Sequence, residues 1–258
     1  MSALDHLLLA STLTAVLAFA FGGWRGIGRA VVVLYGIQLA LLLGMAGGTA
    51  ATLRFEVLGQ PLGWSMDAFG RFFALITLGA AMAAAWFTAG EWGERYAASG
   101  NSLRALHTAL AGNVLAMLLL VASGDLLTLF IGWELVSWAS FLMMALGGER
   151  ALRAALRYVP YAMGGAMAVL GALVLIYAWT GSFDLVLLAQ QLPQLSAGRL
   201  WLLVALLVGG FGVKMGLLPF HLWQAGAYAE APGAGTAFLG AISSRMGFFA
   251  IALVLVRL

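Results

Sequence analysis

The sequence predicts an all-α polytopic membrane protein with about eight transmembrane helices. Hydrophobic residues make up 63% of its 258 residues and charged residues only 9%, and the mean hydropathy is +1.01. Water-soluble domains of this length are not built from such a composition. The apolar residues fall into eight runs, which at about 20 residues per span use roughly 160 residues and leave no room for a soluble domain.

The eight apolar runs follow one another with short connections. The first imitates a signal peptide, but Asp5 and the lack of a basic residue before it favour a retained helix. Six of the nine tryptophans fall at run edges, where an amphipathic ring is favoured: Trp24, Trp64, Trp92, Trp179, Trp201 and Trp223. We expect helices at Leu7–Gly22, Ala30–Gly47, Phe69–Gly90, Thr108–Ala122, Leu126–Leu146, Tyr158–Thr180, Leu200–Phe220 and Thr236–Val256.

The arginines between the runs are distributed unequally between the two sides of the membrane. Successive connections lie on alternate sides of the membrane. One side then carries seven arginines: Arg25, Arg29, Arg95, Arg104, Arg150, Arg153 and Arg157. The other side carries Arg54, Arg199 and Arg257, or four arginines if Arg71 is included. The side with more arginine is normally cytoplasmic. Both termini are therefore expected outside the cytoplasm.

The overall charge and the lack of cysteine exclude several function classes. A formal net charge of +3, spread along the chain, provides neither a nucleic-acid surface nor a polybasic lipid anchor. The absence of cysteine excludes disulfides, thiolate catalysis, iron–sulfur clusters and cysteine zinc sites. We expect no metal site, no cofactor and no catalytic residue in the chain itself.

Three charged residues fall well inside the predicted spans: Glu134, Lys214 and Arg245. A charge in hydrocarbon costs at least about 2.5 kcal/mol, so each is expected to face the protein interior. One interpretation is an ion pathway and the other is a structural ion pair that sets helix register; three charges on three helices favour the pathway. Ser137 lies one turn after Glu134, on the same helix face.

Glu134 and Lys214 are predicted to interact. At about 4 Å and an effective dielectric constant near 20, their coupling is about 4 kcal/mol, so the protonation of each depends on the other. We expect the two side chains within about 6 Å, directly or through one water, in the middle third of the membrane. Breaking such a pair could move a proton.

The helix that carries Lys214 is predicted to be broken. Four glycines and one proline lie between Gly209 and Pro219, a density that disfavours a regular helix. Broken helices in membranes are tolerated where freed carbonyls line a wet cavity. If the helix continued, His221 would lie about 10 Å from Lys214 on the same helix face. His221 would then act as a proton relay or as a residue at the membrane interface. Ser243 and Ser244, before Arg245, could carry a water wire or bond their own backbone.

Three segments carry a family resemblance: Gly124–Leu135, Gly212–Trp223 and the pair Ala231-Pro232. In order, spacing and residue type they resemble the antiporter-like subunits, which are the proton-pumping membrane subunits of respiratory complex I and membrane-bound hydrogenases and the large subunits of Mrp-type sodium/proton antiporters. The resemblance covers at least Phe69–Leu258. A cation 31 residues after Lys214 makes it closest to the D subunit of Mrp antiporters or the M and N subunits of complex I.

The resemblance implies three N-terminal transmembrane helices over residues 1–100 and one antiporter-like five-helix repeat over 101–258, formed by the fourth to eighth helices. It implies a Glu134–Lys214 pair linked through water to Arg245, with His221 on the same hydrated axis. Asp125 matches the acidic residue before the fifth helix, as an N-cap or a point of ion access. The implied setting is a prokaryotic plasma membrane, where the chain translocates protons, or exchanges them for sodium, beside other hydrophobic subunits.

The sequence also departs from the family pattern. Arginine does not release its proton in practice, so Arg245 could gate electrostatically but could not relay. The sequence does not contain the second five-helix repeat of the family. The chain is then a natural split half, a shortened paralogue or a truncated piece. We expect a neighbouring subunit to supply the second repeat. The functional alternatives are a membrane-arm subunit of complex I, of an energy-converting hydrogenase or of an inorganic-carbon uptake complex, and a non-conducting structural subunit.

Overall fold

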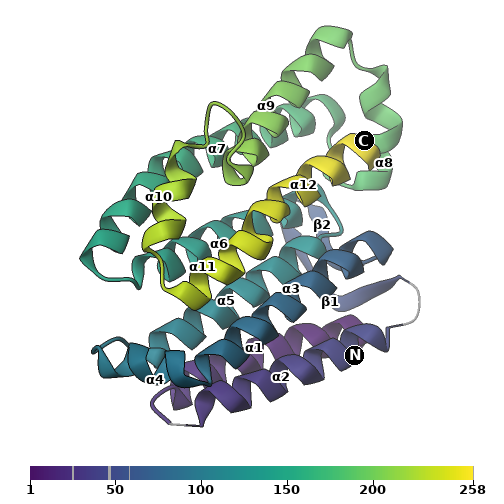
Figure 1. The fold of residues 1–258 in the computed structure, drawn as a ribbon. Helices are drawn as coiled ribbons and strands as arrows, with labels where there is room; N and C mark the ends of the chain where they lie inside the picture. The colour runs from purple at the N-terminus through teal and green to yellow at the C-terminus, as the bar shows by residue number, and fades with distance from the viewer. Residues whose placement is uncertain (25, 46–47, 58, 258) are drawn as a thin grey trace.

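The computed structural model describes residues 1–24, 26–45, 48–57 and 59–257, and consists mainly of helices packed side by side (Figure 1). A short β-hairpin and several short helices connect the long ones. The helices are α1 (Ala3–Phe21), α2 (Ile27–Leu43), α3 (Ala68–Thr88), α4 (Glu91–Ala98), α5 (Leu103–Val121), α6 (Leu126–Ala145), α7 (Glu149–Thr180), α8 (Leu185–Gln191), α9 (Ala197–Met215), α10 (Leu222–Glu230), α11 (Gly233–Phe238) and α12 (Ser244–Arg257), with a 3₁₀ turn η1 (Leu192–Gln194) and a π-helical turn η2 (Leu239–Ser243).

The predicted polytopic helical architecture is confirmed. Within the described chain, seven segments are long and apolar enough to cross a membrane, and the seventh of these is the continuous rod Gly233–Leu255 formed by α11, η2 and α12. The remaining predicted span forms α2, a shorter apolar helix of 17 residues. Its predicted end, Gly47, lies outside the described residues, as do Arg25 and the side chain of Arg257. The orientation relative to the cytoplasm stays a prediction.

A β-hairpin occupies the connection between α2 and α3, for which no secondary structure was predicted from the sequence. Strands β1 (Thr49–Val57) and β2 (Gln60–Met66) pair antiparallel, with Thr49 opposite Met66. The Asp5 carboxylate, which also caps α1, accepts hydrogen bonds from the backbone N–H and hydroxyl of Thr52 at 2.9 and 2.8 Å. The hairpin was missed because short-range pattern reading does not show that Asp5, far away in sequence, anchors it.

Helix α5 lies at the centre of the bundle, packed against α1, α3 and α6. A Cβ at Gly132 of α6 would lie 2.7 Å from the Leu120 Cα of α5, so only glycine permits this approach. Helices α7 and α9 meet in the same way, because a Cβ at Gly165 would lie 2.9 Å from the Gly210 carbonyl oxygen. This second crossing places the end of α9 against α7 and α6.

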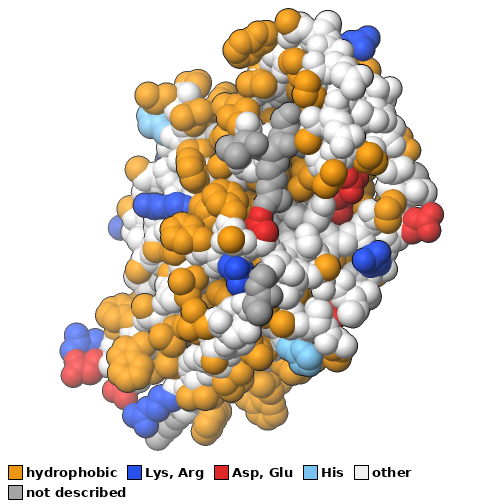
Figure 2. Space-filling model, turned by 90° about the vertical axis from the view of Figure 1, so that its right-hand side faces the viewer, with side chains coloured by type: hydrophobic (Ala, Val, Ile, Leu, Met, Phe, Trp, Pro, Cys, Tyr) orange, Lys and Arg blue, Asp and Glu red, His pale blue; other side chains and the backbone are white. Residues whose placement is uncertain are grey.

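The helices predicted as a repeat correspond to α5, α6, α7, α9 and the α11–α12 rod. Since α5 packs on α1 and α3, and α11 packs on α3, the two halves of the chain share one hydrophobic core. The division at residue 100 and the repeat symmetry stay predictions. Figure 2 shows apolar side chains over much of the visible surface, with few charges. That surface suits contact with lipid or with other apolar protein.

Candidate functional site

The break after α9 is present, at the C-terminal end of the predicted interval. Gly209, Gly210 and Gly212 remain helical, and α9 ends at Gly216, whose φ of +69° is the left-handed conformation typical of a helix C-cap. Turns follow over 217–221 before α10 begins. The glycine-rich stretch is therefore not itself a break, since Gly210 serves the close crossing with α7 and only Gly216 ends the helix.

The carbonyl groups at the end of α9 are partnered by the chain itself. Val213 O accepts from the Trp223 indole N–H at 3.0 Å, and Gly212 O accepts from the Leu217 N–H at 2.9 Å. The expectation that these carbonyls open toward a cavity is wrong for these two. The reason is that α10 folds back along α7 and buries Trp223, at 3% exposure, instead of leaving it at a membrane edge.

Lys214, in the last turn of α9, is enclosed by α6 and α7. It is 2% exposed, and its Nζ donates a hydrogen bond to the Tyr158 hydroxyl at 3.0 Å. The ammonium also lies 5.4 Å from the Tyr158 ring centroid and 5.8 Å from the Trp133 ring centroid, within the range of cation–π attraction. Tyr158 was not predicted as a site residue, although a buried tyrosine hydroxyl requires a partner.

Glu134 is half-buried on α6, and its carboxylate faces the same region. Its Oε1 is buried without a hydrogen-bond partner among the described residues. Within 4.0 Å, the ion pairs of the described chain are the exposed Arg95–Glu91 and Arg153–Glu149 pairs, so Glu134 and Lys214 make no direct contact. Tyr158 lies between the two groups in the sense that it bonds to Lys214 and lines the same pocket as Glu134.

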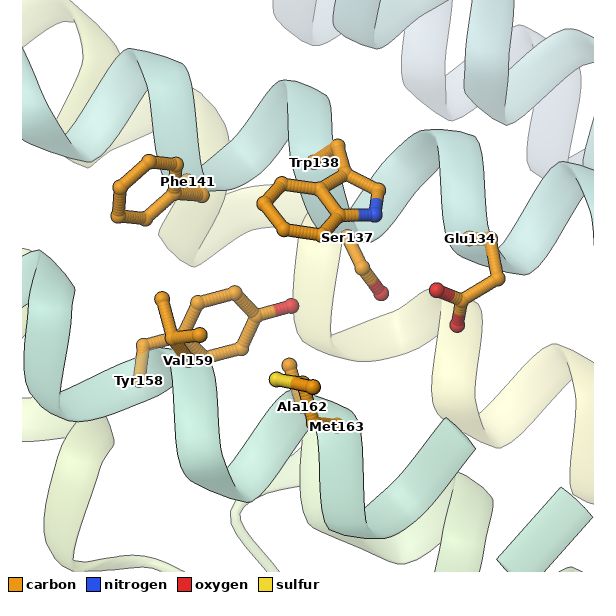
Figure 3. Close-up of a pocket in the computed structure, with 8 residues that line it drawn as sticks. All are labelled: Glu134, Ser137, Trp138, Phe141, Tyr158, Val159, Ala162 and Met163. Atoms are coloured by element: carbon orange, nitrogen blue, oxygen red, sulfur yellow. The ribbon is translucent and has the colours of Figure 1, made fainter. Parts of the chain in front are cut away.

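A small pocket between α6 and α7 collects these polar groups (Figure 3). Figure 3 shows the Glu134 carboxylate and the hydroxyls of Ser137 and Tyr158 directed into the same space, walled by apolar side chains. About 20 Å³ is open to the centre of a water molecule, which suffices for one water. Ser137 donates to the Trp133 carbonyl at 3.0 Å, and its hydroxyl also interacts with that of Tyr158. A single water here would lie among three polar side chains.

Arg245 does not face the interior, contrary to the prediction. It is exposed, and its guanidinium donates to the Gly240 carbonyl and to the Ser244 hydroxyl, the latter at 3.1 Å. The physical reason lies in η2, because the extra residue of a π-helical turn rotates the following side chains around the helix axis by about 100°. No partner carboxylate is present within the described chain.

His221 is also placed differently from the prediction. Helicity does not persist beyond Met215, so His221 lies in the turn before α10, exposed, and not on the helix face of Lys214. The premise for a direct Lys214–His221 relay along one helix is therefore wrong. The interface interpretation of His221 agrees with its exposure.

Ser243 joins a buried polar network that the sequence did not reveal. Its hydroxyl lies 3.2 Å from that of Ser140, which donates to Asn113 Oδ1 at 3.1 Å. Asn113 Nδ2 in turn donates to the carbonyls of Ala109 and Ala139. Ser244 instead points to Arg245, so the two predicted serines face different ways. The network crosses α5, α6 and η2.

Asp125 is the N-cap of α6, as one of its two interpretations predicted. Its carboxylate accepts from the backbone N–H of Thr128 at 2.8 Å and of Gly63 at 3.2 Å, which ties the hairpin to the helix start. Asp125 is buried just outside the α6 span, and this burial raises the pKa of its carboxyl above the usual range, while the hydrogen bonds it accepts oppose the rise. Ion access through Asp125 stays a prediction.

Residues 123–258 hold nearly all of these groups, and they match the family described as NADH:quinone oxidoreductase/Mrp antiporter, transmembrane. The chain belongs to this family. The predicted resemblance to antiporter-like subunits is thereby confirmed. The match begins just before Asp125 and contains Glu134, Tyr158, Lys214 and Arg245.

Curated relatives support the same assignment. The F420H2 dehydrogenase subunit N of Methanosarcina mazei is 28% identical over 77% of this chain and 40% of its own length. The NADH-quinone oxidoreductase subunit N of Desulfitobacterium hafniense is 30% identical over 72% of this chain and 37% of its own length. The chain thus spans less than half the length of the curated relatives it matches.

The fold recurs in two membrane complexes. The archaeal membrane-bound sulfane sulfur reductase shows it with a TM-score of 0.79 at 24% identity, over 98% of this chain and 40% of the other. The Mrp complex from Dietzia sp. DQ12-45-1b shows it with a TM-score of 0.83 at 21% identity, over 96% of this chain and 27% of the other. At sequence identities below 25%, this similarity establishes a shared fold and no more.

Proposed function

We propose that this chain is an ion-translocating part of a larger membrane complex and moves protons through Glu134, a bound water, Tyr158 and Lys214. The observation that carries the proposal is a buried ammonium group held by one tyrosine hydroxyl, near a carboxylate oxygen that lacks a partner among the described residues. A structural ion pair would be closed by direct contact. The open arrangement favours conduction over a purely structural role.

The chemistry follows from the capacities of the three side chains. The Tyr158 hydroxyl accepts a hydrogen bond from Lys214 and still has its own proton to donate. A water in the pocket can accept that proton's hydrogen bond and donate to the Glu134 carboxylate. When Lys214 loses its proton, the attraction that keeps Glu134 ionised disappears and the carboxylate takes up a proton more readily. A change in the charge of Lys214 thus drives uptake or release of a proton by Glu134.

The wider setting is also part of the proposal. Subunits named for complex I and F420H2 dehydrogenase are among the relatives, and an Mrp complex shares the fold. We place the chain in the prokaryotic plasma membrane with both termini outside the cytoplasm, beside other hydrophobic subunits. Protons are the ion that Glu134 and Lys214 suit, and sodium exchange is the alternative. The exposed Arg245 supports a neighbouring membrane segment that offers a carboxylate, since a lone cation in hydrocarbon is costly.

The test replaces Glu134 by Gln in the assembled host complex and measures proton uptake into vesicles. Glu134→Gln keeps the shape and removes the charge, so proton translocation should fall by at least about tenfold while complex assembly stays intact. Glu56→Gln, on the exposed hairpin, is the matched control and should leave translocation unchanged. Unaltered translocation in Glu134→Gln would contradict the proposal, and loss of assembly would support the structural alternative.

A further inference from the structure

A second hollow lies far from the Glu134 pocket, at the end of the bundle where α2 begins and α3 ends. The ends of α2, α3 and α5 and the short helix α4 enclose it, with a volume of about 680 Å³. Helix α4 carries Glu91, Glu94 and Arg95 and is not long enough to span a membrane. The hollow therefore lies at the level where the membrane meets water.

The hollow contains two charges of opposite sign. Arg29 of α2 and Glu94 of α4 both line it, and both are exposed. Neither side chain makes an ion pair or hydrogen bond with another described residue, and they do not pair with each other. Two unpaired, opposite charges on the walls of one cavity suit a ligand that carries both charges.

A buried histidine also lines this hollow. His107 of α5 is 0% exposed, and its Nδ1 has no hydrogen-bond partner among the described residues. Its Nε2 lies 3.4 Å from the Thr88 hydroxyl, at the cavity wall. Because the side chain has no exposed surface, His107 forms part of the wall of the hollow and is not a ligand contact.

The polar hollow continues into an apolar groove. A neighbouring depression of about 440 Å³ shares Arg29, Ala89 and Gly90 with it and runs along Val32 and Val33 of α2 and Trp86 of α3. Val33 is 62% exposed and Trp86 is 73% exposed. Val33 lies in the second turn of α2, and Trp86 lies in the last turn of α3, next to the polar hollow. A polar cavity joined to an apolar groove at the membrane edge has the shape of a phospholipid.

We propose that this hollow and groove form a binding site for a phospholipid with a zwitterionic ethanolamine headgroup. Its phosphate lies at Arg29, its ammonium at Glu94, and an acyl chain follows Val33 and Trp86. A purely anionic headgroup would meet the Glu94 carboxylate without compensation. A choline headgroup has no N–H to donate to Glu94, and free phosphate would leave the groove unused.

The experiment follows tryptophan fluorescence of the full chain in detergent during titration with phospholipids whose acyl chains are brominated, which quench on contact. The Trp86 contribution is the difference between the chain and Trp86→Phe. We expect phosphatidylethanolamine to half-saturate this quenching at a concentration about two- to fivefold lower than phosphatidylcholine or phosphatidylglycerol. This ratio corresponds to the free energy of one exposed ion pair. Inorganic phosphate should not relieve the quenching.

The variants assign the charges. Glu94→Gln should abolish the preference for ethanolamine over choline, and Arg29→Gln should weaken binding of both lipids. Arg150→Gln and Glu56→Gln, exposed residues elsewhere, are the matched controls and should behave as the unaltered chain, with unchanged helix content by circular dichroism. Equal binding of all three lipids, tighter binding of phosphatidylglycerol, or competition by inorganic phosphate would each overturn the proposal.

Discussion

At the scale of single residues, the site depends on groups whose hydrogen-bonding capacity is incompletely used. Lys214 has three N–H donors, and one described hydrogen bond, to Tyr158, uses only one of them. Glu134 Oε1 has no described partner. In a medium of low dielectric constant both conditions are costly, so the free energy of the site changes strongly when a proton or a water is added.

Tyr158→Phe tests whether the hydroxyl connects the two charges. The substitution removes only the oxygen that accepts from Lys214, so proton translocation by the assembled complex should drop, and the free energy of unfolding should fall by about 1–3 kcal/mol because the buried ammonium loses its partner. Vesicle proton uptake and thermal unfolding in detergent measure the two effects. Tyr161→Phe, one turn further along α7, is the control and should change neither. Full translocation in Tyr158→Phe would exclude the hydroxyl from the path.

The buried carboxyl of Asp125 should make the free energy of unfolding depend on pH. Because burial raises the pKa of its carboxyl in the folded chain above the ordinary 3.8, the folded state holds this proton more tightly than the unfolded state does. The contribution of Asp125 to stability is therefore present below about pH 3.8 and declines as pH rises through the raised pKa.

The measurement for Asp125 is the melting temperature in detergent across that pH window. Asp125→Asn should flatten the decline relative to the unaltered chain, at the cost of a weaker N-cap, about 1 kcal/mol at most, since asparagine also caps helices. Asp184→Asn, at the N-cap of α8, is the control for a capping aspartate. Identical pH profiles for Asp125→Asn and the unaltered chain would contradict the assignment.

At the scale of elements, the two irregular helices decide where the charges point. Helix α9 ends at Met215 and is capped by Gly216, between one and two turns beyond the crossing of Gly210 with Gly165, and this end of the helix directs Lys214 inward. The π-helical turn η2 precedes Arg245 and directs it outward. Both irregularities lie in segments that look like uninterrupted apolar runs or glycine-rich stretches in the sequence.

Gly216→Ala should disrupt the end of α9. An alanine there would hold a left-handed backbone, and its Cβ would lie 2.4 Å from the Gln224 Oε1, so we expect a loss of about 1–2 kcal/mol in unfolding free energy. Gly209→Ala is the matched control, because its Cβ would meet nothing within 4 Å and alanine favours the helix by up to about 1 kcal/mol. Equal melting temperatures for the two variants would refute the capping role of Gly216.

At the scale of the whole molecule, the chain presents a large apolar exterior, and Arg245 is an exposed cation on α12. Within the described chain, the hydrogen bonds that the Arg245 guanidinium donates go to Gly240 and Ser244, in its own helix. A cation on a surface that faces hydrocarbon is costly unless an anion pairs with it. The exterior around Arg245 is therefore where we expect a neighbouring membrane segment to contact this chain.

Arg245→Ala should weaken association with that neighbour, and Arg245→Lys should preserve it. The measure is the amount of neighbouring membrane subunit that copurifies with the tagged chain from its native membrane. Arg199→Ala, which removes a guanidinium stacked on Trp179 at 4.9 Å, is the control and should leave copurification unchanged. Undiminished association of Arg245→Ala would remove Arg245 from the interface.

Much of the architecture and part of the site followed from the sequence. The helices were predictable because about 20 apolar residues in a row have few stable arrangements other than a membrane span. Glu134 and Lys214 stood out because charges are rare in such runs. Tyr158, Asn113 and Ser140 did not stand out, because a hydroxyl or amide in an apolar run is tolerated anywhere in a helix bundle.

The sequence by itself determined the polytopic helical class, the two charges Glu134 and Lys214, and a break between Gly209 and Pro219, since each depends on composition or backbone chemistry within a short segment. Only the tertiary structure decided that Lys214 bonds to Tyr158 and not directly to Glu134, that His221 and Arg245 face outward, and that Arg29 and Glu94 share one cavity. The physical reason is that side-chain direction depends on helix crossings and on single-residue irregularities such as η2. A one-residue change in helical phase rotates a charge from the interior to the surface without altering the apolar pattern.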